Sequence, residues 1–96
     1  MPKGYIIGHI TVNDPEAYKE YIRLDTPLIE SHGGVPLVRG GAAEMPEPGQ
    51  PYQRHVIFEF PTYAAARALY YSAEYQEVAK IRRATADSMI VLVEGV

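Results

Sequence analysis

Apolar and polar residues alternate with a period of two in four segments of the chain, which is typical of half-buried β-strands. The predicted strands cover residues 4–12, 35–41, 54–60 and 88–95. The first contains Gly8, and a glycine inside a strand predicts a bulge or a close approach by another element. The second contains Pro36, which cannot donate to a strand ladder and therefore predicts a strand that lies at the sheet edge or begins irregularly.

Apolar residues recur at helical spacing between these strands. Helices are predicted from Asn13 to Ser31, from Thr62 to Tyr71 and from Ser72 to Thr85. Asn13 is expected to cap the first helix, with Glu16 completing a capping box. Pro27 predicts a kink or a break near residues 25–26. Gly33 is expected in the left-handed position that ends the helix.

The order of elements predicts an α+β fold of the ferredoxin-like β-α-β-β-α-β type, with one domain over residues 1–96. Such a fold has a four-stranded antiparallel sheet with its helices on one face. The alternation places Tyr5, Ile7, Leu37 and Ile57 on the other face. That face is too apolar to remain in water, so we expect a second copy of the chain to cover it in a homodimer.

Composition narrows the possible partners. The chain has no cysteine, which excludes disulfides and thiolate chemistry. Its net charge is −3, and its basic residues are scattered, so nucleic acid is not an expected partner. The apolar run near the N-terminus is too short for a signal peptide or a membrane span, and a cytoplasmic location is expected. The eight tyrosines suit half-buried seams and the walls of a pocket.

Several short motifs are spread over the chain from Gly4 to Gly95. They are Asp14-Pro15-Glu16 with Tyr18 and Tyr21, His32-Gly33-Gly34, Leu37-Val38-Arg39-Gly40-Gly41, Glu59-Phe60-Pro61, Ser72-Ala73-Glu74-Tyr75-Gln76, Arg82 and Val93-Glu94-Gly95. As a set they resemble the family called domain of unknown function 1330, in the dimeric α/β-barrel superfamily. The resemblance implies a subunit whose sheet pairs with the sheet of another subunit. It implies no reaction, because the superfamily includes cofactor-free monooxygenases, haem enzymes and ring-isomerising enzymes.

Polar residues interrupt an apolar stripe of the first predicted helix. Tyr18, Ile22, Asp25, Ile29 and His32 follow one another at steps of four and three. Burial would raise the pKa of Asp25, which is a common way to tune an acid or a base. Alternatively, Pro27 breaks the stripe and leaves Asp25 in water, and His32 only contacts the helix C-terminus.

Three polar residues on the strands are further candidates. By alternation, His9, Arg39 and Glu59 point away from the helices. Arg39 could hold a carboxylate with two hydrogen bonds, with His9 or Asp25 as a general base. The alternative is a cross-strand ion pair between Arg39 and Glu59. Arg82 or Arg83 is likewise expected to pair with a carboxylate on the surface.

Two hypotheses about function remain open. In the first, each subunit of a homodimer has a small-molecule pocket between sheet and helices, with polar walls formed by His9, Asp25, Arg39 and Glu59. Its ligand would be a small organic acid or an aromatic compound, and its chemistry would be proton transfer or cofactor-free oxidation. In the second, the homodimer binds a ligand or serves a structural role without catalysis. His9 and His55 lack the spacing of metal ligands, so no metal and no cofactor are expected.

Overall fold

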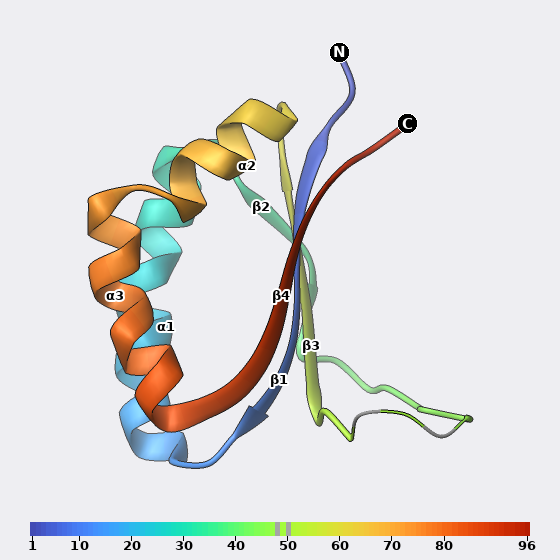
Figure 1. Ribbon diagram of the computed structural model, residues 1–96, viewed down its shortest axis with the longest axis vertical. Coiled ribbons are helices and arrows are strands. Elements are labelled where there is room, and N and C mark those ends of the chain that lie inside the picture. Colours follow the sequence, from blue (N-terminus) through green and yellow to red (C-terminus); the bar gives the residue numbers. More distant parts are fainter. Residues whose placement is uncertain (48, 50) are drawn as a thin grey trace.

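The computed structural model describes residues 1–47, 49 and 51–96. Its elements are β1 (Gly4–Val12), α1 (Pro15–Ser31), β2 (Val35–Arg39), β3 (Arg54–Phe60), α2 (Tyr63–Tyr70), α3 (Ala73–Thr85) and β4 (Ala86–Glu94). The described strands form one antiparallel sheet in the order β2-β3-β1-β4. The helices all cover the same face of this sheet, and the other face is bare (Figure 1). The ferredoxin-like α+β fold is therefore confirmed, with β2 at an edge as Pro36 predicted.

The first helix begins one residue later than the sequence predicted. Asp14, not Asn13, is the N-cap, and its side chain accepts a hydrogen bond of 3.2 Å from the amide of Ala17. Pro15 explains the difference, because proline fits the first helical position and fixes the residue before it as the cap. Asn13 instead donates to Asp87 on β4 at 3.4 Å.

The predicted break at Pro27 is absent. Helix α1 runs from Pro15 to Ser31 with Pro27 inside it. A proline inside a helix costs about 3 kcal/mol, but the face formed by Tyr18, Tyr21, Asp25 and Ile29 is buried. Tertiary packing of that face outweighs the local penalty. The helix ends as predicted, with Gly33 in the left-handed region at a φ of 82°.

Strand β2 departs from simple alternation. Its pairing with β3 is irregular between Pro36 and Val38, where a bulge adds one residue. Arg39 then pairs with Val56, whose side chain faces the helices. The expectation that Arg39 points away from the helices is therefore wrong, because the bulge reverses the alternation of the residues that follow it.

The two faces of the sheet differ in what covers them. The helix side carries the core, in which Phe60 and Leu69 are fully buried. The bare side exposes large apolar residues, among them Val38, Val91 and Val93. In the part of the chain that the structure describes, no helix has the length and apolar character needed to cross a membrane.

Candidate functional site

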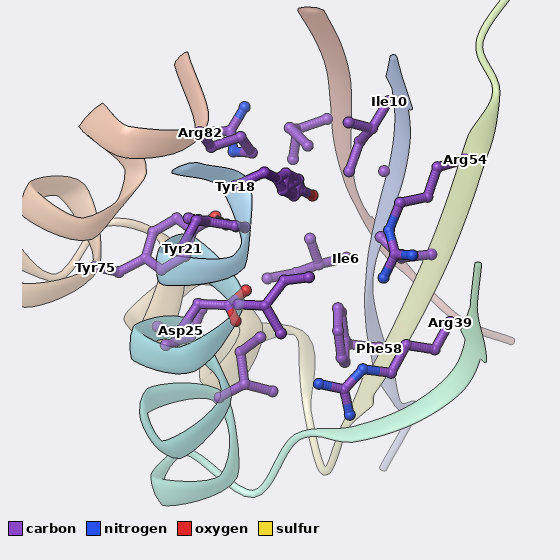
Figure 2. A pocket seen from close by; sticks show the side chains of 16 residues that line it. Ile6, Ile10, Tyr18, Tyr21, Asp25, Arg39, Arg54, Phe58, Tyr75 and Arg82 are labelled. Carbon is purple, nitrogen blue, oxygen red and sulfur yellow. Dashed lines mark hydrogen bonds between the residues drawn. The ribbon is translucent and has the colours of Figure 1, made fainter. Parts of the chain in front are cut away.

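A narrow cavity lies between the sheet and helices α1 and α3, with about 40 Å³ of space open inside it. Its walls are mostly apolar, and Figure 2 shows a small set of polar side chains among them. The polar lining residues are Tyr18, Tyr21, Asp25, Arg39, Arg54, Tyr75 and Arg82. An apolar hollow with a few convergent polar groups is the usual form of a small-molecule site.

Asp25 reaches this cavity from α1 and is only 6% exposed. Burial raises its pKa from 3.8 to about 6. Hydrogen bonds from Tyr21 and Thr26, and the charges of Arg39 and Arg54, act in the opposite direction but do not cancel the effect of burial. A carboxyl group with this pKa can both accept and release a proton near neutral pH.

Two arginines extend from the sheet toward Asp25. Arg39 leaves the end of β2 and Arg54 the start of β3, and their guanidinium groups point into the cavity (Figure 2). Arg39 donates to the hydroxyl of Thr26 at 3.0 Å, which places it beside the next residue along the helix from Asp25. The Nε of Arg54 is buried and has no hydrogen-bond partner. Two cations thus face one carboxyl group in a space that favours an anionic ligand.

Gly40 makes room for Arg54. It has a φ of 72°, and a Cβ built on it would lie 2.3 Å from Nη1 of Arg54. A larger residue would therefore be strained and would also displace the guanidinium group. Gly41, directly after it, has no atom within 4 Å of the corresponding position.

Three buried tyrosines form the wall of the cavity next to Asp25. The rings of Tyr18 and Tyr21 meet edge to face with centroids 5.3 Å apart. The hydroxyl oxygens of Tyr21 and Tyr75 are 2.6 Å apart and share a hydrogen bond between α1 and α3. This wall combines aromatic surface with hydroxyl groups, as suits an aromatic ligand that carries polar substituents.

The other polar residues predicted for the pocket lie elsewhere. His9 and Glu59 are on the bare face, where Glu59 accepts a 3.0 Å hydrogen bond from Tyr5. His32 caps the C-terminal end of α1, with its Nδ1 3.0 Å from the carbonyl oxygen of Leu28. Of the five predicted site residues, the structure brings only Asp25 and Arg39 together at the cavity. Because they lie on opposite faces, Arg39 and Glu59 do not form the cross-strand pair considered as an alternative.

His9 pairs with His55 on the bare face. Their Nδ1 atoms are 2.8 Å apart, so one imidazole donates a hydrogen bond to the other. The strand register brings these residues opposite each other, although they are 46 positions apart in the sequence. Among the described residues, no group of three or more His, Cys, Asp or Glu side chains could share a metal ion.

Sequence reasoning did not place Arg54, Tyr21, Tyr75 or Arg82 at the site. Arg54 opens a strand, a position where a charged residue is ordinary. The clearest signal in the sequence was that Arg54 has the same parity as Val56 and Phe58, so its side chain lies on the helix side of the sheet. Arg82 is only 4% exposed, and none of the ion pairs among the described residues includes it, so the predicted surface pair is wrong for this residue.

The match to a family model supplies the identity of the domain. The model is the domain of unknown function DUF1330, and it matches residues 3–96. The chain belongs to this family. Among curated proteins, none matches it significantly.

Solved structures share the fold of this DUF1330 chain. A protein of unknown function from Rhodopseudomonas palustris is 22% identical, with a TM-score of 0.80 over 99% of this chain and 83% of its own. A dimeric ferredoxin-like protein of unknown function from Jannaschia is 13% identical, with a TM-score of 0.67 over 96% of this chain and 98% of its own. The cofactor-independent oxygenase SnoaB from Streptomyces nogalater is 11% identical, with a TM-score of 0.62 over 97% of this chain and 92% of its own. At these identities the likeness concerns the fold.

Proposed function

We propose that the cavity binds a small organic acid, aromatic or planar in shape, and that Asp25 exchanges a proton with it. The observation that carries this proposal is that Arg39, Arg54 and Asp25 line the same mostly apolar hollow (Figure 2). The two guanidinium groups would hold the ligand's carboxylate or a similar anionic group. The tyrosine wall would cover its flat face.

The excess of positive charge supports an anionic ligand. Arg54 has a buried Nε without a partner, and leaving a buried donor unsatisfied costs about 1–3 kcal/mol. A bound carboxylate would remove this cost and would gain charge-assisted hydrogen bonds. A neutral ligand could accept from this donor, but it would lack the attraction between opposite charges that a carboxylate adds.

The proposed chemistry is proton transfer next to a carbonyl group. The C–H bond of the substrate would break, its proton would pass to the Asp25 carboxylate, and the electron pair would move onto the carbonyl oxygen. Arg39 and Arg54 would stabilise the oxyanion that results. Return of the proton to another carbon would complete an isomerisation, whereas reaction of the carbanion with dioxygen would be the oxidative alternative. The shared fold with a cofactor-independent oxygenase is the reason to test that alternative.

Calorimetric titration with aromatic and aliphatic carboxylates tests the binding step. We expect at least one carboxylate to bind, its uncharged amide to fail, and Arg54→Gln to weaken binding roughly 10- to 100-fold, the value of one charge-assisted hydrogen bond. Arg23→Gln is the matched control, because Arg23 pairs with Glu20 on the exposed side of α1. Equal binding of acid and amide would refute the proposed role of the arginines.

Turnover needs a separate measurement. Exchange of substrate protons with deuterated water, followed by NMR, would reveal proton transfer, and an oxygen electrode would reveal oxidation. Loss of both signals in Asp25→Asn, with binding retained, is the expected result. Binding without exchange or oxygen uptake in the unmodified protein would favour the non-catalytic alternative.

We also propose that the bare sheet face pairs with the same face of a second copy. Val91 and Val93 are each 40% exposed there and Val38 is 38% exposed, although all three are apolar. Exposed apolar patches of this kind are uncommon on monomers. The dimeric ferredoxin-like protein from Jannaschia supports a second copy as the occupant.

A further inference from the structure

Arg82 carries a buried positive charge on the helix side of the cavity. It extends from α3, is only 4% exposed, and lines the cavity together with Arg39 and Arg54 from the sheet. Two contacts compensate this charge in part: Nη1 donates to the hydroxyl of Ser88, and the guanidinium carbon lies 6.0 Å from the ring centroid of Tyr21. Neither contact is with an anion, and none of the ion pairs among the described residues includes Arg82. A buried charge without a counter-charge is strongly destabilising.

The charges that line the cavity do not balance. Its lining includes three arginines and one carboxyl group, which are Arg39, Arg54, Arg82 and Asp25. Three cations against one carboxylate leave an excess of two positive charges when Asp25 is ionised. None of the ion pairs among the described residues includes any of these four side chains. Because buried charges are normally paired, the cavity is complementary to a ligand with two negative charges rather than one.

Unpartnered hydrogen-bond donors occur on two walls of the cavity. Among the described residues, the buried side-chain nitrogen and oxygen atoms without a hydrogen-bond partner are the Nε of Arg54 and the Nε of Arg82. Arg54 belongs to β3 and Arg82 to α3, so these donors come from the sheet and from the helix layer, on opposite sides of the cavity (Figure 2). A single carboxylate presents both of its acceptor oxygens at one end of a molecule. Donors on opposite walls therefore favour a ligand with a carboxylate at each end.

We propose that the ligand of this cavity is a short dicarboxylic acid, with one carboxylate held by Arg39 and Arg54 and the other by Arg82. This statement rests on the proposed function and narrows its substrate class from organic acids in general to dicarboxylic acids. The space open inside the cavity is small, so the chain between the two carboxylates is short. That chain would lie against the tyrosine wall, and each carboxylate would accept charge-assisted hydrogen bonds from guanidinium groups.

Calorimetric titration at pH 8 with malonate, succinate and fumarate, each compared with its own monoamide, tests the proposal. An acid and its monoamide have nearly the same size and shape, but the acid has one more negative charge. We expect at least one dicarboxylate to bind roughly 10- to 100-fold more tightly than its monoamide, the value of one charge-assisted hydrogen bond. Equal affinities of acid and monoamide in all three pairs would overturn the proposal.

The isomers fumarate and maleate test the placement of the two carboxylates. Fumarate directs its carboxylates to opposite ends of the molecule, whereas maleate has both on one side of its double bond. Because Arg54 and Arg82 lie on opposite sides of the cavity, fumarate should bind more tightly than maleate. Equal or tighter binding of maleate would place both carboxylates at one wall and would overturn the assignment of the second carboxylate to Arg82.

Variants of two neighbouring arginines identify the group that holds the second carboxylate. Arg82→Gln should reduce the affinity for the dicarboxylate to nearly that of its monoamide, and should leave the affinity for the monoamide almost unchanged. Arg83→Gln is the matched control, because Arg83 follows on the same helix, is exposed, and donates to Gln76 at 2.7 Å without lining the cavity. An equal loss of dicarboxylate affinity in both variants would place the ligand in the outer hollow that Arg82 and Arg83 share, and would overturn the proposal.

The same titrations separate this proposal from the proposed function. Monoamides that bind as tightly as their acids would refute the dicarboxylate ligand and leave a site for a single carboxylate. Failure of every carboxylate, monoamide or diacid, to bind the unmodified protein would refute the proposed function and the dicarboxylate with it. If Arg82→Gln does not fold, the comparison of acid and monoamide in the unmodified protein still decides the proposal.

Discussion

Replacing Asp25 with Asn is expected to stabilise the protein at neutral pH. Burial holds the pKa of Asp25 at about 6, against 3.8 for the free side chain. Such a difference corresponds to about 3 kcal/mol. Because the folded-state pKa is the higher one, the folded protein binds the proton more tightly, and stability falls as the pH rises from about 4 to about 6. Above this range the folded state carries the full cost of an ionised buried carboxylate. Asn has almost the same shape and no charge, so it avoids this cost.

Urea unfolding at a series of pH values from 4 to 8 measures the effect. At pH 8 we expect Asp25→Asn to be more stable than the original protein by about 2–3 kcal/mol, and the two should converge near pH 4. Asp87→Asn is the matched control, because it makes the same substitution at an exposed position. Parallel stability curves for the original protein and Asp25→Asn would show that Asp25 titrates normally, and the argument for a tuned proton acceptor would fail.

Three further predictions concern other parts of the molecule. Gly40→Ala should lower the free energy of unfolding by about 1–2 kcal/mol, because residue 40 has a positive φ. It should also weaken carboxylate binding about tenfold by displacing Arg54, whereas Gly41→Ala should have neither effect. Equal calorimetric affinities of the two variants for a carboxylate would refute this. Light scattering at micromolar concentration should show a dimer of about twice 10.7 kDa for the unmodified protein and a monomer for Val91→Lys. A monomeric unmodified protein at that concentration would refute the proposed pairing of sheets. Ser72→Ala should lower the free energy of unfolding in urea by about 1 kcal/mol, because the Ser72 hydroxyl accepts a 3.1 Å hydrogen bond from the amide of Tyr75. An unchanged unfolding midpoint would show that this N-cap does not stabilise the helix.

Most of the fold could be predicted from the sequence, because the local sequence signals and the tertiary packing favour the same elements. The strands β1 and β3 have the predicted bounds and faces, and Thr62 and Ser72 cap α2 and α3 as expected. Strand β4 begins at Ala86 rather than at residue 88, and β2 ends at Arg39 rather than at residue 41. Two further errors lie where proline gives two signals at once. Pro15 moved the N-cap by one residue, and Pro27 sits in a helix that buried side chains hold together.

The site was harder to predict from the sequence than the fold, for two physical reasons. A bulge reverses alternation, and Pro36 indicates an edge or an irregular start without fixing where the alternation reverses, so Arg39 was assigned to the wrong face. Long side chains also reach far from their own positions, and Arg54 and Arg82 enter the cavity from elements on opposite sides of it. Asp25 was the exception. A carboxylate at helical spacing between Tyr18 and Ile29 is an anomaly that the sequence alone reveals.

The buried polar groups of the cavity lower the free energy of unfolding, and a chain of 96 residues has only a small hydrophobic core to compensate for that loss. Asp25 and Arg82 are buried charged side chains, and neither has an ion-pair partner among the described residues. Gly8 leaves space on the cavity floor, where an added Cβ would lie 2.9 Å from a methyl group of Val56. Apolar residues in place of the buried charges would give a more stable protein. A ligand that binds only the folded state would offset these costs by mass action, by about 2.7 kcal/mol at a concentration one hundred times its dissociation constant. The same features that lower the stability of the ligand-free domain are thus those that a small anion would use.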